Sequence, residues 1–291
     1  MAAGDLSHYA KHSRWTDPGD LAAHLATLPA DPQALPELVG GLVLHPLFAP
    51  AGPASSEPGL RSIRDILAAV LAKDDQPLLQ ARPPEKRVLG TCRNYALLAG
   101  AILRQHDVPA RLRVGFADYF TSEFWEDHWV CEYHDGSAWH LLDPELSPEV
   151  RQRFAISFDP ADVPRDRFLA AGPTWQALRC GAQTPARFGV SAIGISGLWF
   201  AAGSLLRDLA ALDCEETMPW DYWGPARDLR PDIPISADRL ILLDALADAL
   251  VAVDAAAEDA ASVTAAYPWA ALTPSVLSFP QGQPVEVSLA A

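Results

Sequence analysis

Hydrophobic residues recur at helical spacing in the first and last parts of the chain and alternate in the middle. Ser62 and Asp65 are placed as an N-terminal cap before one apolar helical stripe: Ile63, Ile66, Leu67, Val70 and Leu71. Ser236 holds the same place before a second stripe: Leu240, Leu243, Ala247, Leu250 and Val251. Between Val88 and Leu146 one apolar helical run is followed by three short alternating stretches, which predict strands.

This pattern predicts three consecutive regions. Residues 1–80 read as a helical prelude, 81–148 as a mixed core and 149–291 as a mainly helical region. Proline-rich segments at 28–37 and 47–59 break the prelude into short helices, because proline ends helices. We expect an α+β fold in which the region 149–291 packs on the core as one globular unit.

Residues 189–206 form an uncharged stretch that could be either a membrane-spanning helix or a segment packed in the core. Seven of these eighteen residues are Gly or Ser, whereas a spanning helix needs about 20 predominantly apolar residues. Arg207 and Asp208 follow at once. A small-residue helix or loop packed in the core is therefore favoured over a membrane span.

The charge and the cysteine content limit which classes of partner and which cellular compartment we expect. The formal net charge of −15 comes from 37 acidic and 22 basic residues, which disfavours nucleic acid and anionic membranes as partners. The cysteines at 92, 131, 180 and 214 show no C-x-x-C pair, as expected for reduced thiols. The first residues contain no apolar signal-peptide core. These features predict a cytoplasmic protein.

Cys92 opens the helical run of the middle region. Thr91 can cap this helix, which leaves Cys92 in the first turn, where unpaired N–H groups and the helix dipole favour a thiolate. Arg93, Lys86 and Arg87 add positive charge nearby in the sequence. The alternative is a small buried structural cysteine, which is common in proteins.

A predicted hairpin supplies a candidate base and a carboxylate. Asp135-Gly136 is a favoured two-residue hairpin loop, and it makes His134 face Ser137. The same register places His128 opposite Asp143, with Cβ atoms roughly 4.5–5.5 Å apart. Taken singly, the histidine could be a strand-end residue in contact with solvent, and the aspartate a turn residue. Together with Cys92 they have the composition of a thiol triad.

Strand alternation separates the side chains of this hairpin onto two faces. Val130, Leu141 and Trp139 share the predicted His128 face, and we expect them to pack on the Cys92 helix. Zinc is an alternative, since His128, Cys131 and His134 lie close together in sequence. Alternation points Cys131 to the opposite face, with Trp129 and Tyr133. Cys131 is therefore predicted to be a core residue, and no metal site is expected.

The residues now described resemble the transglutaminase-like branch of the papain-type cysteine enzymes. The matching pieces are "GTCRNYALLAGAILRQHDVPARLRVGF", "EDHWVCEYHDG" and "WHLLDPE", which cover about residues 85–146. The resemblance implies a nucleophile helix packed on a small antiparallel sheet, with helical N- and C-terminal extensions. It also implies Cys92 as nucleophile, His128 as general base and acid, and Asp143 as the residue that orients the imidazole.

The implied function is acyl transfer or amide hydrolysis through a Cys92 thioester, with no cofactor. The substrate would be a small molecule, a peptide or a carrier-bound acyl group, with or without an amine acceptor. Candidate substrate-binding residues are Tyr119 and Trp129, in an aromatic stretch, and Arg207, which could bind an anionic group. Alternatively, the aromatic rings are buried under the helices of residues 1–80, and Arg207 lies at a solvated helix end. The alternative function is a non-catalytic interaction module with the same fold.

Overall fold

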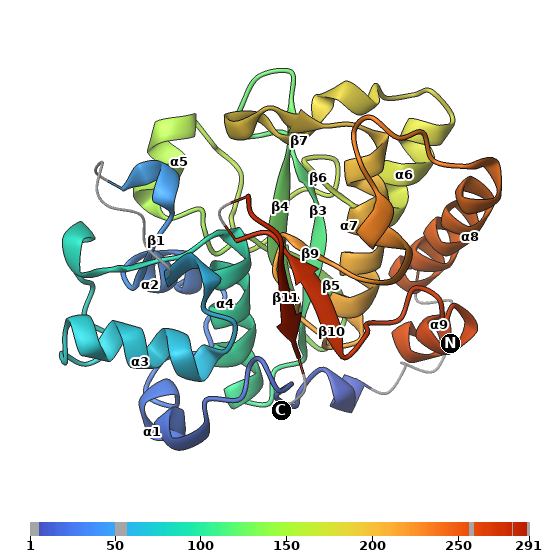
Figure 1. Cartoon of the computed structure of the whole chain (residues 1–291). Coiled ribbons are helices and arrows are strands. Elements are labelled where there is room, and N and C mark those ends of the chain that lie inside the picture. Colours follow the sequence, from blue (N-terminus) through green and yellow to red (C-terminus); the bar gives the residue numbers. More distant parts are fainter. Residues whose placement is uncertain (1–5, 50–56, 256–258, 281, 290–291) are drawn as a thin grey trace. The chain divides into compact units, whose positions relative to one another are not determined.

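The computed structural model describes residues 6–49, 57–255, 259–280 and 282–289 (Figure 1). The fold is α+β, as predicted. The chain forms two compact units, and each combines segments that are distant in sequence. The first contains Met1–Leu112 and Trp129–Pro164, and the second contains Arg113–His128 and Arg165–Ala291. The three consecutive regions inferred from the pattern stay a prediction.

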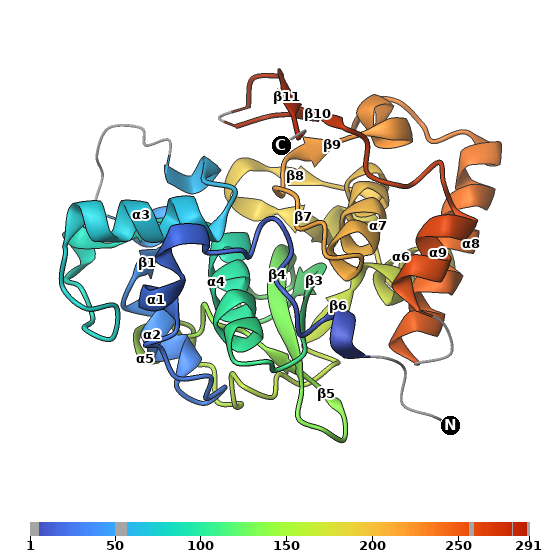
Figure 2. The ribbon, with the colours of Figure 1, turned by 90° about the horizontal axis from the view of Figure 1, so that it is seen from below.

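The first unit is built around helix α4 (Cys92–Gln105), nearly all of whose residues are buried. Short helices of the prelude contact α4 (Figure 2): α1 (Ala22–Leu25), α2 (Leu35–Gly40) and α3 (Ile63–Lys73). Strands β1 (Val43–Leu44) and β2 (Val88–Leu89) pair in parallel, and β2 leads into α4. Helix α5 (Pro148–Phe154) follows the core.

Local sequence signals explain where these helices begin. The Ser62 hydroxyl accepts a hydrogen bond from the Asp65 N–H at 3.1 Å and donates one to the Asp65 carboxylate at 2.7 Å. The cap predicted for α3 is confirmed. Four positions of its predicted stripe are buried: Ile63, Ile66, Leu67 and Val70.

The main sheet contains β3 (Ala110–Ala117) and β4 (Trp125–His134), and each strand contributes residues to both units. In the first unit, β5 (Trp139–Leu142) pairs antiparallel with β4. In the second, β3 pairs antiparallel with β6 (Phe168–Ala170), β4 pairs in parallel with β7 (Phe188–Val190), and β7 pairs antiparallel with β8 (Ile195–Ser196). The strand order is β6-β3-β4-β7-β8, with β5 on β4, so the sheet is mixed rather than wholly antiparallel.

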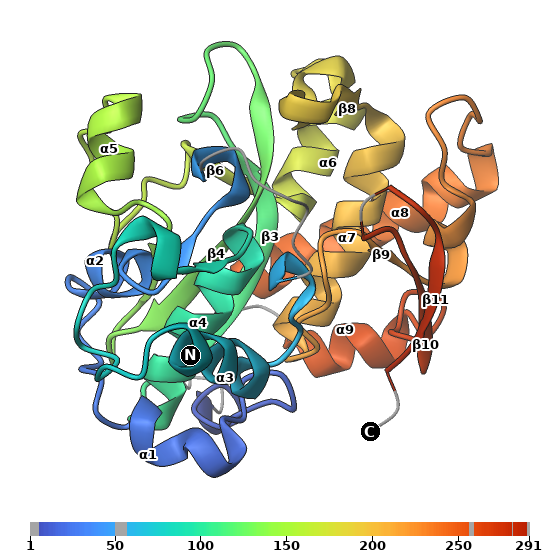
Figure 3. The same cartoon turned by 60° about the vertical axis from the view of Figure 1, so that its left-hand side comes forward.

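Four α-helices belong to the described part of the second unit (Figure 3). They are α6 (Ala171–Arg179), α7 (Leu198–Leu212), α8 (Ala237–Asp254) and α9 (Ala260–Ala266). Helix α7 contacts the other three, and most of its residues are buried. Ser236 caps α8 as predicted, since its hydroxyl accepts from the Arg239 N–H. A small sheet of β11 (Val285–Ser288), β10 (Ser275–Ser278) and β9 (Asp221–Tyr222) completes the unit.

The uncharged stretch at 189–206 begins within β7, continues through β8 and runs into α7. Its second half packs in the core, with residues 200–206 buried. Among the residues that the structure describes, no helix has both the length and the hydropathy needed to cross a bilayer.

The hairpin between β4 and β5 differs from the predicted register. His134 pairs with Trp139 and Cys131 with Leu142, so the predicted His134–Ser137 pairing is wrong. The Asp135 carboxylate accepts hydrogen bonds from the Ser137 and Ala138 N–H groups, and the Asp135 N–H donates to the Ala138 carbonyl. This side-chain turn extends the loop by two residues and shifts the register. A pairing of His128 with Asp143 across the ladder is therefore wrong as well.

Candidate active site

Cys92 is the first residue of α4, as predicted, and its side chain is 8% exposed. The Asn94 side-chain oxygen accepts hydrogen bonds from the Thr91 N–H at 3.0 Å and from the Thr91 hydroxyl at 3.1 Å. These bonds fix the backbone on both sides of the cysteine. The Asn94 contribution was missed from the sequence, although the Thr-x-x-Asn spacing is a variant of a capping box.

Gly90 allows the chain to approach the start of α4 closely. A Cβ atom at this position would lie 2.7 Å from Val43 Cγ1 and 2.9 Å from Asn94 Cβ. Both distances are far below van der Waals contact, so only glycine fits without a local shift. The turn that presents Cys92 is therefore sterically determined.

The cations near Cys92 in sequence have other partners. Arg93 is fully buried, and its Nη1 donates to the Arg61 carbonyl at 2.7 Å. Lys86 pairs with Asp74 at 3.0 Å, and the Arg87 Nε donates to the Arg82 carbonyl. Arg93 therefore anchors the loop before α3, and Lys86 is neutralised by a carboxylate. The helix N-terminus supplies positive potential at Cys92, and the charge of Arg87, which acts on Tyr95 in α4, adds to it.

Helix α4 packs on the face of the sheet opposite to the one predicted. A Cβ built at Gly100 would lie 3.1 Å from Leu112 Cδ1 and 3.9 Å from Cys131 Sγ. The Cys131 face, and not the face of Val130 and Leu141, therefore approaches the helix. Cys131 is fully buried, which confirms its predicted place in the core. The prediction erred because alternation assigns residues to two faces but does not say which face the helix covers.

Asp143 follows β5 and is fully buried in the first unit. Its Oδ1 accepts a hydrogen bond from the Glu145 N–H at 3.0 Å, and its own N–H donates to the Pro160 carbonyl at 2.8 Å. Burial, followed by the negative charges of Glu145 and Asp143, raises the pKa of Tyr95, which is one turn beyond Cys92 in α4. The charge of Asp143 therefore acts on a side chain of α4.

His128 belongs to the second unit and is 2% exposed. Its ring meets those of Tyr119, Phe120 and Phe168 edge to face, with centroids 5.9, 4.9 and 6.5 Å away. The histidine is therefore not a solvent-exposed strand end. Aromatic packing of this kind holds an imidazole in one orientation.

The structure places the predicted substrate-binding residues in different surroundings. Tyr119 is 5% exposed and packs against Phe120 with centroids 4.7 Å apart. Trp129 is fully buried, and its indole N–H has no hydrogen-bond acceptor among the described residues. Arg207 is 1% exposed within α7.

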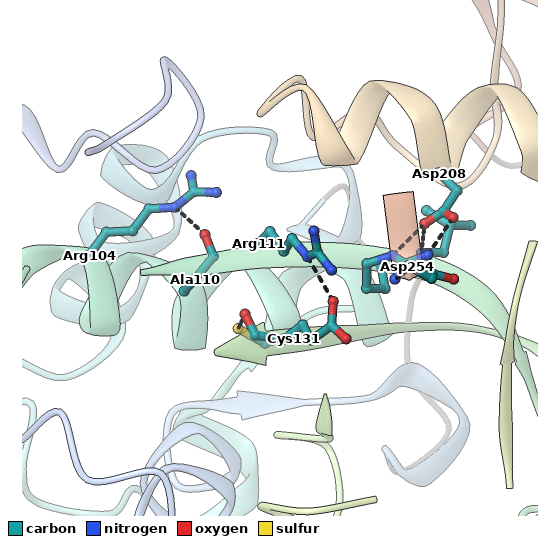
Figure 4. A network of polar contacts seen from close by, with 9 residues as sticks. Arg104, Ala110, Arg111, Cys131, Asp208 and Asp254 are labelled. Carbon is teal, nitrogen blue, oxygen red and sulfur yellow. Dashed lines mark hydrogen bonds and ion pairs between the residues drawn. The ribbon is translucent and has the colours of Figure 1, made fainter. Parts of the chain in front are cut away.

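Arg207 and Asp208 are both buried, so α7 does not end in solvent there. Asp208 pairs with Arg113, with Oδ2 2.9 Å from Nη2 and Oδ1 3.1 Å from Nε (Figure 4). Asp208 Oδ1 also accepts from the Val114 N–H at 2.8 Å, and Asp254 binds the Arg113 Nη1. Asp208 thus has a long-range partner that sequence adjacency did not reveal.

Asp127 was not singled out in the sequence. Burial raises its pKa to about 6, while the nearby charges of Arg207 and His128 act in the opposite direction. Its Oδ1 is buried and has no hydrogen-bond partner within the described part of the chain. A carboxyl directly before the candidate histidine was visible in "EDHW", but its burial depends on the tertiary fold.

The first unit contains a cavity of about 100 Å³ that Tyr95, Arg87 and Arg153 help to line. Cys92 is not among its lining residues. No group of three or more His, Cys, Asp or Glu side chains placed to hold a metal occurs in the described ranges. None of the four cysteines, all of them described, forms a disulfide bond.

Comparison with known proteins confirms the family resemblance over the middle of the chain. Residues 69–144 match the model of the Transglutaminase-like superfamily. This segment includes Cys92, His128 and Asp143. No curated protein matches the chain.

Among solved structures, the chain is similar to a "putative cysteine protease" from Cytophaga hutchinsonii. The identity is 18% and the TM-score 0.37, over 58% of this chain and 46% of that chain. The matched part thus spans about half the length of that protein.

Proposed function

We propose that this protein, which carries a transglutaminase-like core over residues 69–144, is a cysteine-dependent enzyme that transfers or hydrolyses an acyl group. Cys92 is the proposed nucleophile, His128 the general base and acid, and Asp143 the residue that orients the imidazole. The observation that carries the proposal is the position of Cys92, at the first residue of a buried helix within the matched segment. A helix N-terminus lowers the cost of forming a thiolate.

The reaction begins when the Cys92 sulfur attacks the carbonyl carbon of an amide or thioester. His128 takes the thiol proton, a C–S bond forms, and the negative charge moves to the carbonyl oxygen, towards which the Cys92 N–H can donate. Collapse of this intermediate breaks the bond to the leaving amine or thiol, which receives the proton from His128. Water or an acceptor amine then attacks the thioester, and His128 repeats the proton transfer.

The substrate is proposed to be an acyl group on a small molecule, a peptide or a carrier. Tyr119 and Trp129 are proposed to shape its pocket from the aromatic segment near His128. Exclusion of water from the thioester would favour transfer to an amine, whereas access of water would favour hydrolysis.

Alkylation with iodoacetamide tests the nucleophile, because the chain contains its own reference thiol. Cys180 is exposed, whereas Cys92 is buried. If Cys92 is activated, it reacts near pH 7 faster than Cys180 despite its lower exposure, as quantified for each cysteine by peptide mass spectrometry. We expect His128→Ala to slow Cys92 alkylation by about tenfold or more and to leave the Cys180 rate unchanged. Cys131 and Cys214, both buried, serve as the matched slow controls.

Trapping of the thioester identifies the acyl donor. Wild-type protein is incubated with cell extract, and intact mass is compared with that of Cys92→Ser. An adduct that maps to Cys92 and disappears on treatment with hydroxylamine supports the proposal. Equal alkylation rates for all buried cysteines, with no adduct on Cys92, would favour the non-catalytic interaction module instead.

A further inference from the structure

The guanidinium of Arg207 has unused donors although it is buried in the second unit. The side chain is 1% exposed, and its Nη2 donates to the Ser204 hydroxyl at 3.1 Å. Nε and Nη1 have no hydrogen-bond partner among the residues that the structure describes. Most buried polar groups in folded proteins are hydrogen-bonded, because an unpaired one costs free energy. Two open donors on a buried cation are therefore an exception that needs a reason.

The neighbours of Arg207 stabilise its positive charge but do not accept hydrogen bonds from all of its N–H groups. The Phe200 and Tyr222 rings lie 5.5 and 5.4 Å from Cζ, which stabilises the cation through the aromatic electrons. Neither ring is a strong acceptor for a hydrogen bond. A Cβ at Gly203 would lie 3.1 Å from Nη1, so the glycine provides room for the guanidinium. Helix α7 thus contributes Phe200, Gly203, Ser204 and Arg207 to one site.

Asp127 is a second buried group of this unit that lacks a hydrogen-bond partner for one oxygen among the described residues. The charges of Asp127 and Arg207 interact, yet the two side chains form no ion pair within 4.0 Å. Asp127 Oδ1 is itself buried and has no partner in the described ranges. The other charged groups that act on Asp127 are His128 and Glu126 of the same strand. Arg207 therefore offers open donors, and Asp127 an open acceptor, to a further group.

We propose that Arg207, positioned by the Ser204 hydroxyl, is the recognition point of a carboxylate-binding site that Asp127 completes. A guanidinium offers donors in a planar fork, which matches the two oxygens of a carboxylate better than any other common ligand except phosphate. Asp127, once protonated, can donate a hydrogen bond to the bound anion, so binding takes up a proton. This deepens the proposed function by assigning a carboxylate to the acyl donor or acceptor.

Binding of model carboxylates tests the site without any turnover. The probes are butyrate, a short acetylated peptide with a free C-terminal carboxylate, the same peptide as its amide, and inorganic phosphate. Isothermal titration at pH 7 in two buffers of different ionisation enthalpy gives affinity and proton uptake. We expect butyrate or the peptide acid to bind, the peptide amide not to bind, and affinity to fall at least tenfold in Arg207→Met. Tighter binding of butyrate would indicate a small organic acid as the natural ligand, and tighter binding of the peptide acid would indicate a peptide C-terminus.

Matched variants separate recognition from folding. Arg179→Met removes an exposed arginine of the same unit and should leave binding unchanged. Asp127→Asn should keep binding but abolish the proton uptake. Arg207→Met should unfold at the same temperature as wild type or a higher one, because it removes buried N–H groups that lack partners. If it does not fold, Arg207→Lys keeps the charge without the fork and should still weaken binding.

Two results would overturn the carboxylate site: equal affinity in wild type and Arg207→Met, or binding of phosphate with no binding of either acid. A melting temperature that falls by more than about 5 °C in Arg207→Met, with no carboxylate bound by the wild type, would mean that Arg207 is structural. Selective alkylation of Cys92 in Arg207→Met distinguishes failure of this site from failure of the proposed enzyme.

Discussion

Arg207 and Asp208 are neighbours in α7 and are equally buried, yet their surroundings differ completely. Asp208 accepts two hydrogen bonds from Arg113 and one from the Val114 N–H. Among the described residues, the guanidinium of Arg207 has one hydrogen-bond partner, the hydroxyl of Ser204. Burial alone therefore does not tell whether a charged residue supports the fold or is available for a ligand.

The difference lies in the number of groups that compensate each charge. Burial raises the pKa of Asp208, and the paired Arg113 opposes that effect. Arg113 also binds Asp254 of α8, so this cluster connects β3, α7 and α8 within the second unit (Figure 4). A saturated buried cluster of this kind fixes the relative positions of its elements. Within the described part of the chain, the Arg207 guanidinium forms no comparable hydrogen-bond connection between elements.

The largest expected effect comes from breaking the saturated cluster. Arg113→Met leaves the Asp208 carboxylate buried without its cation, which should reduce the free energy of unfolding by about 3–5 kcal/mol. Chemical denaturation measures this loss. The double variant Arg113→Met with Asp208→Leu removes both charges and should recover a large part of it. A single variant as stable as wild type would contradict the structural role of the cluster.

Features set by neighbours in sequence were predictable from the chain alone. Ser62, Thr91 and Ser236 each precede a helical stripe and each lies at the start of the expected helix. Capping needs only the next three residues, so a short window contains the whole signal. The family resemblance, and with it Cys92 at a helix start, came from the same kind of local pattern.

Features that depend on distant residues were not predictable. The hairpin register was missed for a different, local reason: the Asp135 side chain binds the Ser137 and Ala138 N–H groups and so competes with a two-residue turn. The partner of Asp208 is 95 residues away. Asp127 became a candidate only through burial. For Asp208 and Asp127 the decisive surroundings are formed by the fold, whereas at the hairpin one local preference outweighed another.

The second prediction concerns the pH dependence that Asp127 adds to stability. Its pKa in the folded protein is raised to about 6 from 3.8, so the folded state binds this proton more tightly than the unfolded state. Between pH about 4 and 6 the folded state therefore holds more protons, and stability falls as the pH rises. We expect Asp127→Asn to remove a decline of about 1–3 kcal/mol over this range.

The measurement is the unfolding free energy of wild type and Asp127→Asn at several pH values from 4 to 7. The difference between the two proteins isolates Asp127 from other titrating groups, including His128. The free energy of unfolding of Asp127→Asn, relative to that of the wild type, should increase as the pH rises. The increase should level off above pH about 6. If the unfolding free energies of the two proteins change with pH in the same way, Asp127 is solvated or paired in the folded protein. Asp127 would then no longer count with Arg207 as a buried group without a partner.

The smallest expected effect belongs to a saturated pair at the surface. Arg179 binds Asp244 through Nε at 2.8 Å and Nη2 at 3.0 Å, and both side chains are more than a third exposed. In Arg179→Gln the Asp244 carboxylate keeps the Trp175 indole N–H at 2.7 Å and gains water. Because solvent screens the lost attraction, chemical denaturation should show a loss of only about 0–1 kcal/mol. If Arg179→Gln lowers the free energy of unfolding as much as Arg113→Met does, burial does not matter. The destabilisation would then depend only on how many hydrogen-bond partners the arginine has.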